Sequence, residues 1–241
     1  MPQNMTSEQF EQLLMSYQSS NELKKYERFF PLSQRGDDKF IGVRMGQVFA
    51  LAKAHMDLPL EEVEQLLESP IHEIRVGAVS IMDFQARSKK TSPAHRKELF
   101  DLYIRRHDRI NCWDLVDRSA PHVVGRYLAD KPRDPLYKLV GSTNVWERRT
   151  AIVSTLYFLS QGDKRDTFKL AELLLSDSEE FIHKATGWLL RSAGGQELLE
   201  FLDRHAASMP RIALRYAVEK LEEALRSHYL SLKKRSASEL R

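Results

Sequence analysis

The sequence has little of what disulfides, membranes and secretion require. It contains a single cysteine, Cys112, in 241 residues, which excludes an intramolecular disulfide and a cysteine-rich metal site. No apolar run approaches the ~18 residues of a membrane span. Residues 1–12 (MPQNMTSEQFEQ) lack the basic and apolar regions of a signal peptide. These absences predict a cytoplasmic protein without a membrane segment.

Metal-binding motifs are also missing. The eight histidines are scattered without the spacing of metal ligands, and no H-E-x-x-H sequence occurs. We therefore expect no metal site and assign the histidines no catalytic role. Cys112 has no evident histidine partner, so we interpret it as a small buried thiol rather than a reactive nucleophile.

The composition that remains is that of an ordinary globular protein. Apolar residues make up 42% of the chain and charged residues 29%, with a net charge of +3. A mildly positive charge is compatible with nucleic-acid binding but does not indicate it. The distribution of the charges along the fold therefore matters more than their sum.

Apolar periodicity of the helical kind runs through almost the whole chain. It predicts helices at residues 7–18, 21–29, 45–56, 59–68, 71–88, 94–107, 112–129, 135–141, 144–160, 166–175, 179–193, 195–206 and 210–228. Residues 31–44, rich in Gly and Asp, read as a loop. No convincing alternating segment appears, so the sequence predicts an all-α protein.

Several of these helices share a pattern in which a basic residue precedes a small one by two positions. It occurs at Arg75, Arg149, Lys184 and Arg215, with spacings of 74, 35 and 31 residues, so the first gap holds two units of about 37. Paired helices at this period are typical of an α-solenoid of HEAT type. We expect one such domain over residues 1–232, with a concave basic face, and a polar tail at 233–241.

The unit that departs from this pattern contains Trp113 and Asp117. Four residues apart in a helix, they project from the same face. An aromatic surface beside a carboxylate could pack against a sugar and stabilise positive charge on it. A core tryptophan with an exposed aspartate is the alternative for such a pair alone. A further tryptophan, Trp188, follows Lys184 in residues 181–191, and an exposed position for it is plausible.

Taken in order, three motifs resemble one family. W-D-x-V-D begins at Trp113, N-x-W-x-x-R-x-A at Asn144 and F-I-x-K-A-x-G-W-x-L-R at Phe181. Together they resemble the AlkD-type DNA alkylation repair glycosylases, built from HEAT-like repeats, and residues 36–43 look like that family's G-x-D-K-F-x-G-V loop. The resemblance covers about residues 22–225.

The resemblance implies a monofunctional N-glycosylase that releases cationic alkylated purines, such as 3-methyladenine and 7-methylguanine, from duplex DNA. By position, Asp117 matches the catalytic carboxylate, Trp113 and Trp188 the aromatic pair, and Arg149 the arginine beside them. A cationic purine is already a good leaving group, so a carboxylate that stabilises an oxocarbenium-like sugar and positions water would suffice. No cofactor is expected.

The duplex partner would be held through phosphate contacts. Our candidates for these contacts are Arg148, Lys184, Arg191, Arg75, Arg215, Lys39 and Arg44. Whether Arg148 or Arg149 faces the DNA stays open, with the repeat register favouring Arg149. A monomer is expected. The alternatives are a non-catalytic protein that binds damaged or branched DNA, and a protein–protein scaffold, a common use of helical solenoids.

Overall fold

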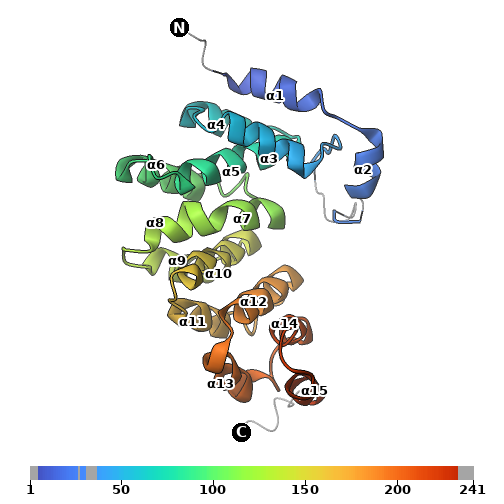
Figure 1. The fold of residues 1–241 in the computed structure, drawn as a ribbon, viewed down its shortest axis with the longest axis vertical. Helices are drawn as coiled ribbons and strands as arrows, with labels where there is room; N and C mark the ends of the chain where they lie inside the picture. The colour runs from blue at the N-terminus through green and yellow to red at the C-terminus, as the bar shows by residue number, and fades with distance from the viewer. Residues whose placement is uncertain (1–4, 27, 31–36, 233–241) are drawn as a thin grey trace. The chain divides into compact units, whose positions relative to one another are not determined.

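The computed structural model describes residues 5–26, 28–30 and 37–232 (Figure 1). Within these residues the regular structure is helical, and the one β-type contact is an isolated parallel bridge between Lys39 and Ile71. The all-α prediction is confirmed. None of the helices in this part of the chain is long and apolar enough to cross a membrane.

The chain divides into two compact units, residues 1–127 and 128–241. The expectations of one continuous domain over residues 1–232 and of a solenoid with a concave face remain predictions. Residues 233–241, expected to form a polar tail, lie outside the described residues.

The first unit stacks its helices around one central helix, α5. Its elements are α1 (Ser7–Met15), α2 (Ser20–Tyr26), α3 (Met45–Ala54), α4 (Leu60–Leu67), α5 (His72–Arg87), α6 (Pro93–Arg105), α7 (Trp113–Ala120) and the π-helical turn η2 (Pro121–Gly125). α5 contacts α3, α4, α6 and α7, and nearly all of it is buried, including the polar side chains of His72, Glu73, Arg75 and Asp83. Buried polar groups need partners, and these partners build the site described below.

The second unit begins at Leu128, the last residue of the short α8 (Arg126–Leu128). Its helices are α9 (Asp134–Val140), α10 (Val145–Ser160), α11 (Arg165–Leu173), α12 (Glu180–Ala193), α13 (Gly195–His205), α14 (Arg211–Ala217) and α15 (Glu223–Ser231). α12 lies between α10 and α14. At Gly187 an added Cβ would collide with the backbone carbonyl of Ala213 and with Cβ of Tyr216, so this glycine allows α14 to lie directly on α12.

Several helices begin where local capping chemistry predicts. Thr6 and Gln9 form a reciprocal capping box at α1. Ser92 accepts from the N–H of His95, and Pro93 occupies the first turn of α6. At α10, Asn144 accepts from the N–H of Trp146. These caps explain why the predicted starts of these helices agree with the structure to within one residue.

The predicted helix at 112–129 is helical over residues 113–128, but its hydrogen bonding changes at Pro121. Pro121 has no N–H and its ring would clash with the carbonyl four residues earlier. The chain widens into a π-helical turn in which Arg126 donates its backbone N–H to the carbonyl of Pro121, five residues back. α7 therefore ends at Ala120, and the chain continues helically through η2 and α8 to Leu128.

The prediction of one helix over residues 210–228 is wrong, because the chain turns between α14 and α15. No Pro or Gly marks this break. Glu222 adopts an extended conformation before α15, and the turn lets Tyr229 become buried and donate its hydroxyl to Asp203 Oδ1 at 2.7 Å. Burial of this tyrosine is a tertiary contact, which helical periodicity cannot predict.

Candidate functional site

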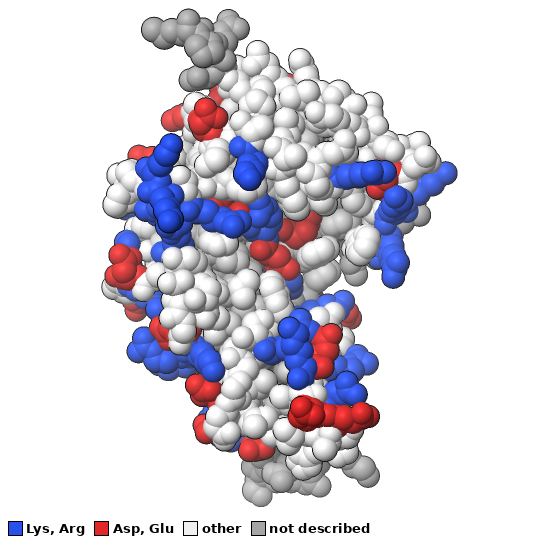
Figure 2. Space-filling view, viewed as in Figure 1, with Lys and Arg blue, Asp and Glu red and all other residues white. Residues whose placement is uncertain are grey.

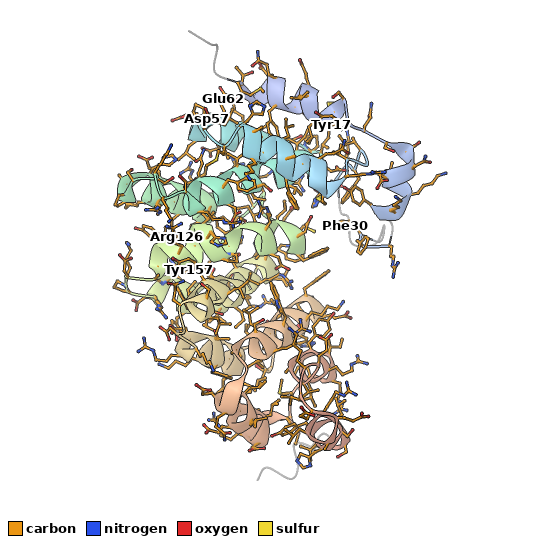
Figure 3. All side chains as sticks on the ribbon, viewed as in Figure 1. Tyr17, Phe30, Asp57, Glu62, Arg126 and Tyr157 are labelled. Carbon is orange, nitrogen blue, oxygen red and sulfur yellow. The ribbon has the colours of Figure 1, made fainter. Side chains whose placement is uncertain are left out.

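Trp113 and Asp117 lie on one face of α7, as the spacing predicts. Trp113 is the first residue of the helix and Asp117 the fifth, and both are partly exposed. The indole of Trp113 stacks on the ring of Phe30, with centroids 5.6 Å apart and planes 17° apart. Figure 3 shows Phe30 beyond the end of α2, beside α7. An aromatic plane and a carboxylate are thus presented together, with one indole face already covered.

The loop before α3 is fixed by the N-terminal turn of α5. Glu73, which is 0% exposed, accepts backbone N–H groups from Ile41 at 3.1 Å, Gly42 at 2.8 Å and Val43 at 3.4 Å. Gly42 has φ +75°, a conformation that suits glycine. The glycine and the loop's backbone donors explain why this stretch carries a recognisable motif.

Beneath Trp113, α5 and α7 are joined by a buried polar network. His72 Nε2 lies 2.7 Å from Asp114 Oδ2, and His72 Nδ1 lies 3.5 Å from Asp38 Oδ2. Arg75 pairs with the same Asp38 oxygen and donates to Asn111 Oδ1 at 3.2 Å. The loop, the start of α5 and the start of α7 are therefore tied into one cluster.

Burial alone would lower the pKa of His72, but the charge and hydrogen bond of Asp114, together with the nearby Asp38 carboxylate, outweigh it and raise that pKa to about 9. His72 is therefore a cation at neutral pH. Sequence reasoning gave the histidines no role, because His72 and Asp114 are 42 residues apart and nothing local indicates that they meet. The missed members of the site are His72, Asp114, Asp38 and Phe30.

Arg75 must be withdrawn from the predicted DNA contacts. Its side chain is 0% exposed, and its guanidinium donates to the carbonyl of Ser69 at 3.0 Å as well as to Asp38. A basic residue at this repeat position was expected to line a surface. Instead, the loop containing Asp38 covers it, and the arginine neutralises a carboxylate inside the unit.

His72, Cys112 and Asp114 are the potential metal ligands that cluster in the described part of the chain, with ligand atoms within 4.8 Å of one another. Burial raises the pKa of the Cys112 thiol far above its ordinary value, and the Asp114 charge adds to this. Metal binding needs a thiolate and a neutral imidazole. The three residues as arranged suit an ion pair beside a neutral thiol better than a metal site.

In the second unit, Arg148 and Arg149 both serve the packing of α10. Arg148 forms a forked pair with Asp177, Nε to Oδ2 at 2.6 Å and Nη2 to Oδ1 at 3.1 Å. Arg149 is 5% exposed and donates to the carbonyl of Phe181. The structure therefore holds Arg149 as a buried support for the start of α12 rather than as an exposed phosphate contact.

Trp188 is partly exposed on α12, with Lys184 and Arg191 on the same side of the helix at spacings of four and three residues. Lys184 pairs with Glu180 at 2.6 Å, and Arg191 pairs with Glu219. The face of the molecule in Figure 2 likewise shows Lys and Arg beside Asp and Glu in each unit. Exposed ion pairs of this kind contribute about 0–1 kcal/mol to stability. A DNA phosphate could therefore replace Glu180 or Glu219 as the partner of these cations.

The remaining predicted contacts are surface residues. Lys39 and Arg215 are exposed, and Arg44 is exposed while pairing with Glu22 at 3.0 Å. These three, with Lys184 and Arg191, remain the accessible cations among the predicted DNA contacts.

The fold and these side chains define a class: an all-α protein in which α7, α10 and α12 each carry a partly exposed tryptophan beside charged groups. Residues 10–221 match the family model described as DNA alkylation repair enzyme. The match covers most of the chain, which therefore belongs to the DNA alkylation repair enzyme family. The family assignment made from the three motifs is confirmed.

A solved structure described as a predicted DNA alkylation repair enzyme from Enterococcus faecalis is similar to this chain. Its TM-score is 0.64 at 18% sequence identity, and the match covers 86% of this chain and 97% of the other. At this identity the likeness supports the fold. No curated protein matches the chain.

Proposed function

We propose that this protein is a DNA glycosylase that hydrolyses the N-glycosidic bond of cationic alkylated purines in duplex DNA. The bond between the purine nitrogen and C1′ breaks, and its electron pair leaves with the base, which departs neutral. Positive charge then develops on the deoxyribose, where the carboxylate of Asp117 stabilises it. Water attacks C1′ and gives up its proton to Asp117. No cofactor is required, because the leaving group is activated by its own alkylation.

The observation that carries the proposal is the common face of Trp113 and Asp117 on α7, in a chain of the alkylation repair family. The reason is electrostatic, because an anion and the negative face of an indole both attract a cation placed beside them. A sugar with oxocarbenium character is such a cation. The proposal thus explains why an aromatic residue and a carboxylate are presented together.

The second unit would contribute affinity. Trp188 lies between Lys184 and Arg191 on α12, so an aromatic contact would be flanked by two cations that can bind phosphates. In the proposal the two units act on one duplex as a solenoid of HEAT-like helix pairs with a concave basic face, and the protein works as a monomer. Arg149 acts through its bond to Phe181, at the beginning of α12.

The test is release of free methylated purines from methylated duplex DNA by the wild type and by Asp117→Asn. The substitution removes the charge and keeps the shape, so release should fall by at least about 100-fold while DNA binding is retained. Asp101→Asn is the matched control, because Asp101 is a partly exposed aspartate of the same unit that pairs with Lys97. Release should be unchanged in this variant.

The other outcomes select the alternatives. Tight DNA binding by a wild type that releases no base would indicate a non-catalytic protein for damaged or branched DNA. Neither release nor DNA binding would indicate a protein–protein scaffold. Equal release by Asp117→Asn and the wild type would refute the role of Asp117.

A further inference from the structure

Two polar clamps fix the rotation of α7 against α5. Successive helical residues are about 100° apart, so Asp114 and Arg118 lie on the side next to Trp113 and Asp117. Asp114 meets His72 at 2.7 Å, and Arg118 meets Asp83 at 2.9 Å. Because these contacts hold one side of α7 against α5, the neighbouring side with Trp113 and Asp117 is fixed in direction.

The clamp at His72 is the one next to Trp113. His72 and Asp83 are eleven residues apart, about 16 Å along α5. Asp114 directly follows Trp113 in the sequence. Asn111, which accepts a hydrogen bond from Arg75, lies two residues before Trp113. A change at His72 is therefore transmitted to the first turn of α7, while a change at Asp83 acts on its last turn.

A second path links His72 to the indole through aromatic rings. The imidazole stacks on Phe40, with centroids 4.7 Å apart and planes 24° apart. The centroid of the imidazole also lies 5.1 Å from that of the Phe30 ring, and Phe30 in turn stacks on Trp113. His72 thus supports both the backbone that carries Trp113 and the ring that covers one face of its indole.

The network is balanced in charge. Asp38 and Asp114 are the carboxylates, and His72 and Arg75 the cations, with Nη2 of Arg75 and Nδ1 of His72 both directed at Asp38 Oδ2. Glu73, Cys112 and Tyr26 are further titratable groups beside this network. Glu73 accepts the backbone N–H groups of the loop, and the thiol of Cys112 is held neutral. Burial and the charges of Glu73 and Asp114 raise the pKa of Tyr26, so its hydroxyl also stays neutral. Removing the charge of any member leaves a buried charge without its partner, which is costly.

We propose that the buried Asp38–His72–Asp114 network is a positioning device for the reaction, setting the orientation of Trp113 and Asp117 without touching the substrate. This inference rests on the proposed glycosylase function. Catalysis by a preorganised carboxylate is sensitive to geometry, and a displacement of about 1 Å can cost about 100-fold in rate. The network should therefore affect the chemical step rather than DNA binding.

The experiment compares Asp114→Asn and His72→Gln with Asp166→Asn, which removes a buried charge in the second unit, where Asp166 pairs with Arg133. Base release is measured in single turnover with enzyme in excess over methylated duplex, and affinity by titration of unmethylated duplex. We expect the rate to fall about tenfold or more in Asp114→Asn and His72→Gln, with affinity unchanged. Asp166→Asn should lower stability but keep a rate close to that of the wild type.

The rate should also depend on pH. In the wild type it should decline as pH rises through about 9, where His72 loses its proton, with enzyme-free DNA as the blank at each pH. In Asp114→Asn the decline should occur at lower pH, because one stabilising carboxylate is gone. Equal rate losses in Asp166→Asn and Asp114→Asn, or an alkaline decline retained in His72→Gln, would overturn the positioning role.

A readout without DNA separates this inference from the glycosylase proposal. In a variant with Trp146→Phe and Trp188→Phe, Trp113 is the remaining tryptophan, and its emission and quenching by acrylamide can be followed from pH 7 to 10. A transition near pH 9 that His72→Gln abolishes supports the coupling even if the wild type releases no base. A flat titration, or a transition that persists in His72→Gln, refutes it.

Discussion

α5 in the first unit and α12 in the second each carry a basic residue two positions before a small one, yet they use it differently. Arg75 in α5 is 0% exposed and neutralises Asp38 inside the unit. Lys184 in α12 has a side chain that is 40% exposed and pairs with Glu180 of its own helix. The same repeat position thus supplies internal structure in one unit and a surface cation in the other.

The helices that carry Trp113 and Trp188 differ in the same way. α7 is held by buried ion pairs on one side and by the stacked ring of Phe30 on its exposed side. α12 is held by apolar packing and by the close approach of α14 at Gly187. A helix fixed by charges is suited to a task that needs exact geometry, and one fixed by close packing leaves its surface charges free to exchange partners.

The largest expected difference between the two units is in the free energy of unfolding when Arg75 or Lys184 is replaced. Arg75→Met should lower the free energy of unfolding by about 3–5 kcal/mol, because Asp38 loses a buried partner. Lys184→Met should change it by less than about 0.5 kcal/mol. Urea denaturation measures both. Equal effects would contradict the assignment of Arg75 to the interior, and Asp38→Asn added to Arg75→Met should restore part of the loss.

Packing in the second unit is tested at Gly187. Gly187→Ala should cost about 1–3 kcal/mol, because the new methyl group meets the backbone of α14, which cannot move aside as a side chain would. Gly46→Ala is the matched control, since nothing lies within 4 Å of its Cβ position. That variant should be stabilised by about 0.4–1 kcal/mol. A harmless Gly187→Ala would show that the contact with α14 is loose.

Stability of the first unit should depend on pH through His72. Its pKa is raised from 6.5 to about 9 in the folded protein, so the folded state holds the proton more tightly. The stability that this provides is fully present below pH 6.5 and is lost as pH rises to about 9. Urea denaturation at pH 6, 7.5 and 9 should show the difference between wild type and His72→Gln shrinking. A constant difference would contradict the ion pair.

The smallest expected effect is at the surface of α12. Lys184→Gln should weaken duplex binding slightly and reduce the dependence of log K on log salt by about one unit, as expected for loss of one phosphate contact. Lys169→Gln, an exposed lysine on α11, is the control and should leave the slope unchanged. Identical slopes for the two variants would remove Lys184 from the predicted interface.

Periodicity and capping predicted most of the helices because both are local properties. The limits of α5, α10 and α12 were predicted to within one residue. The common face of Trp113 and Asp117 followed from helical spacing alone. The break between α14 and α15 was missed because it depends on the burial of Tyr229 against Asp203, a contact between residues 26 apart in the sequence.

The sequence by itself determined the helical class, the family, and the pair of residues proposed to act on the sugar, because motifs and spacing are written along the chain. Only the tertiary structure decided which charges are internal. It placed Arg75 and Arg149 in the interior, left Lys184 and Arg215 at the surface, and brought His72 to Asp38 and Asp114. Burial and ion pairing depend on which distant segments cover a side chain, and no local pattern carries that information.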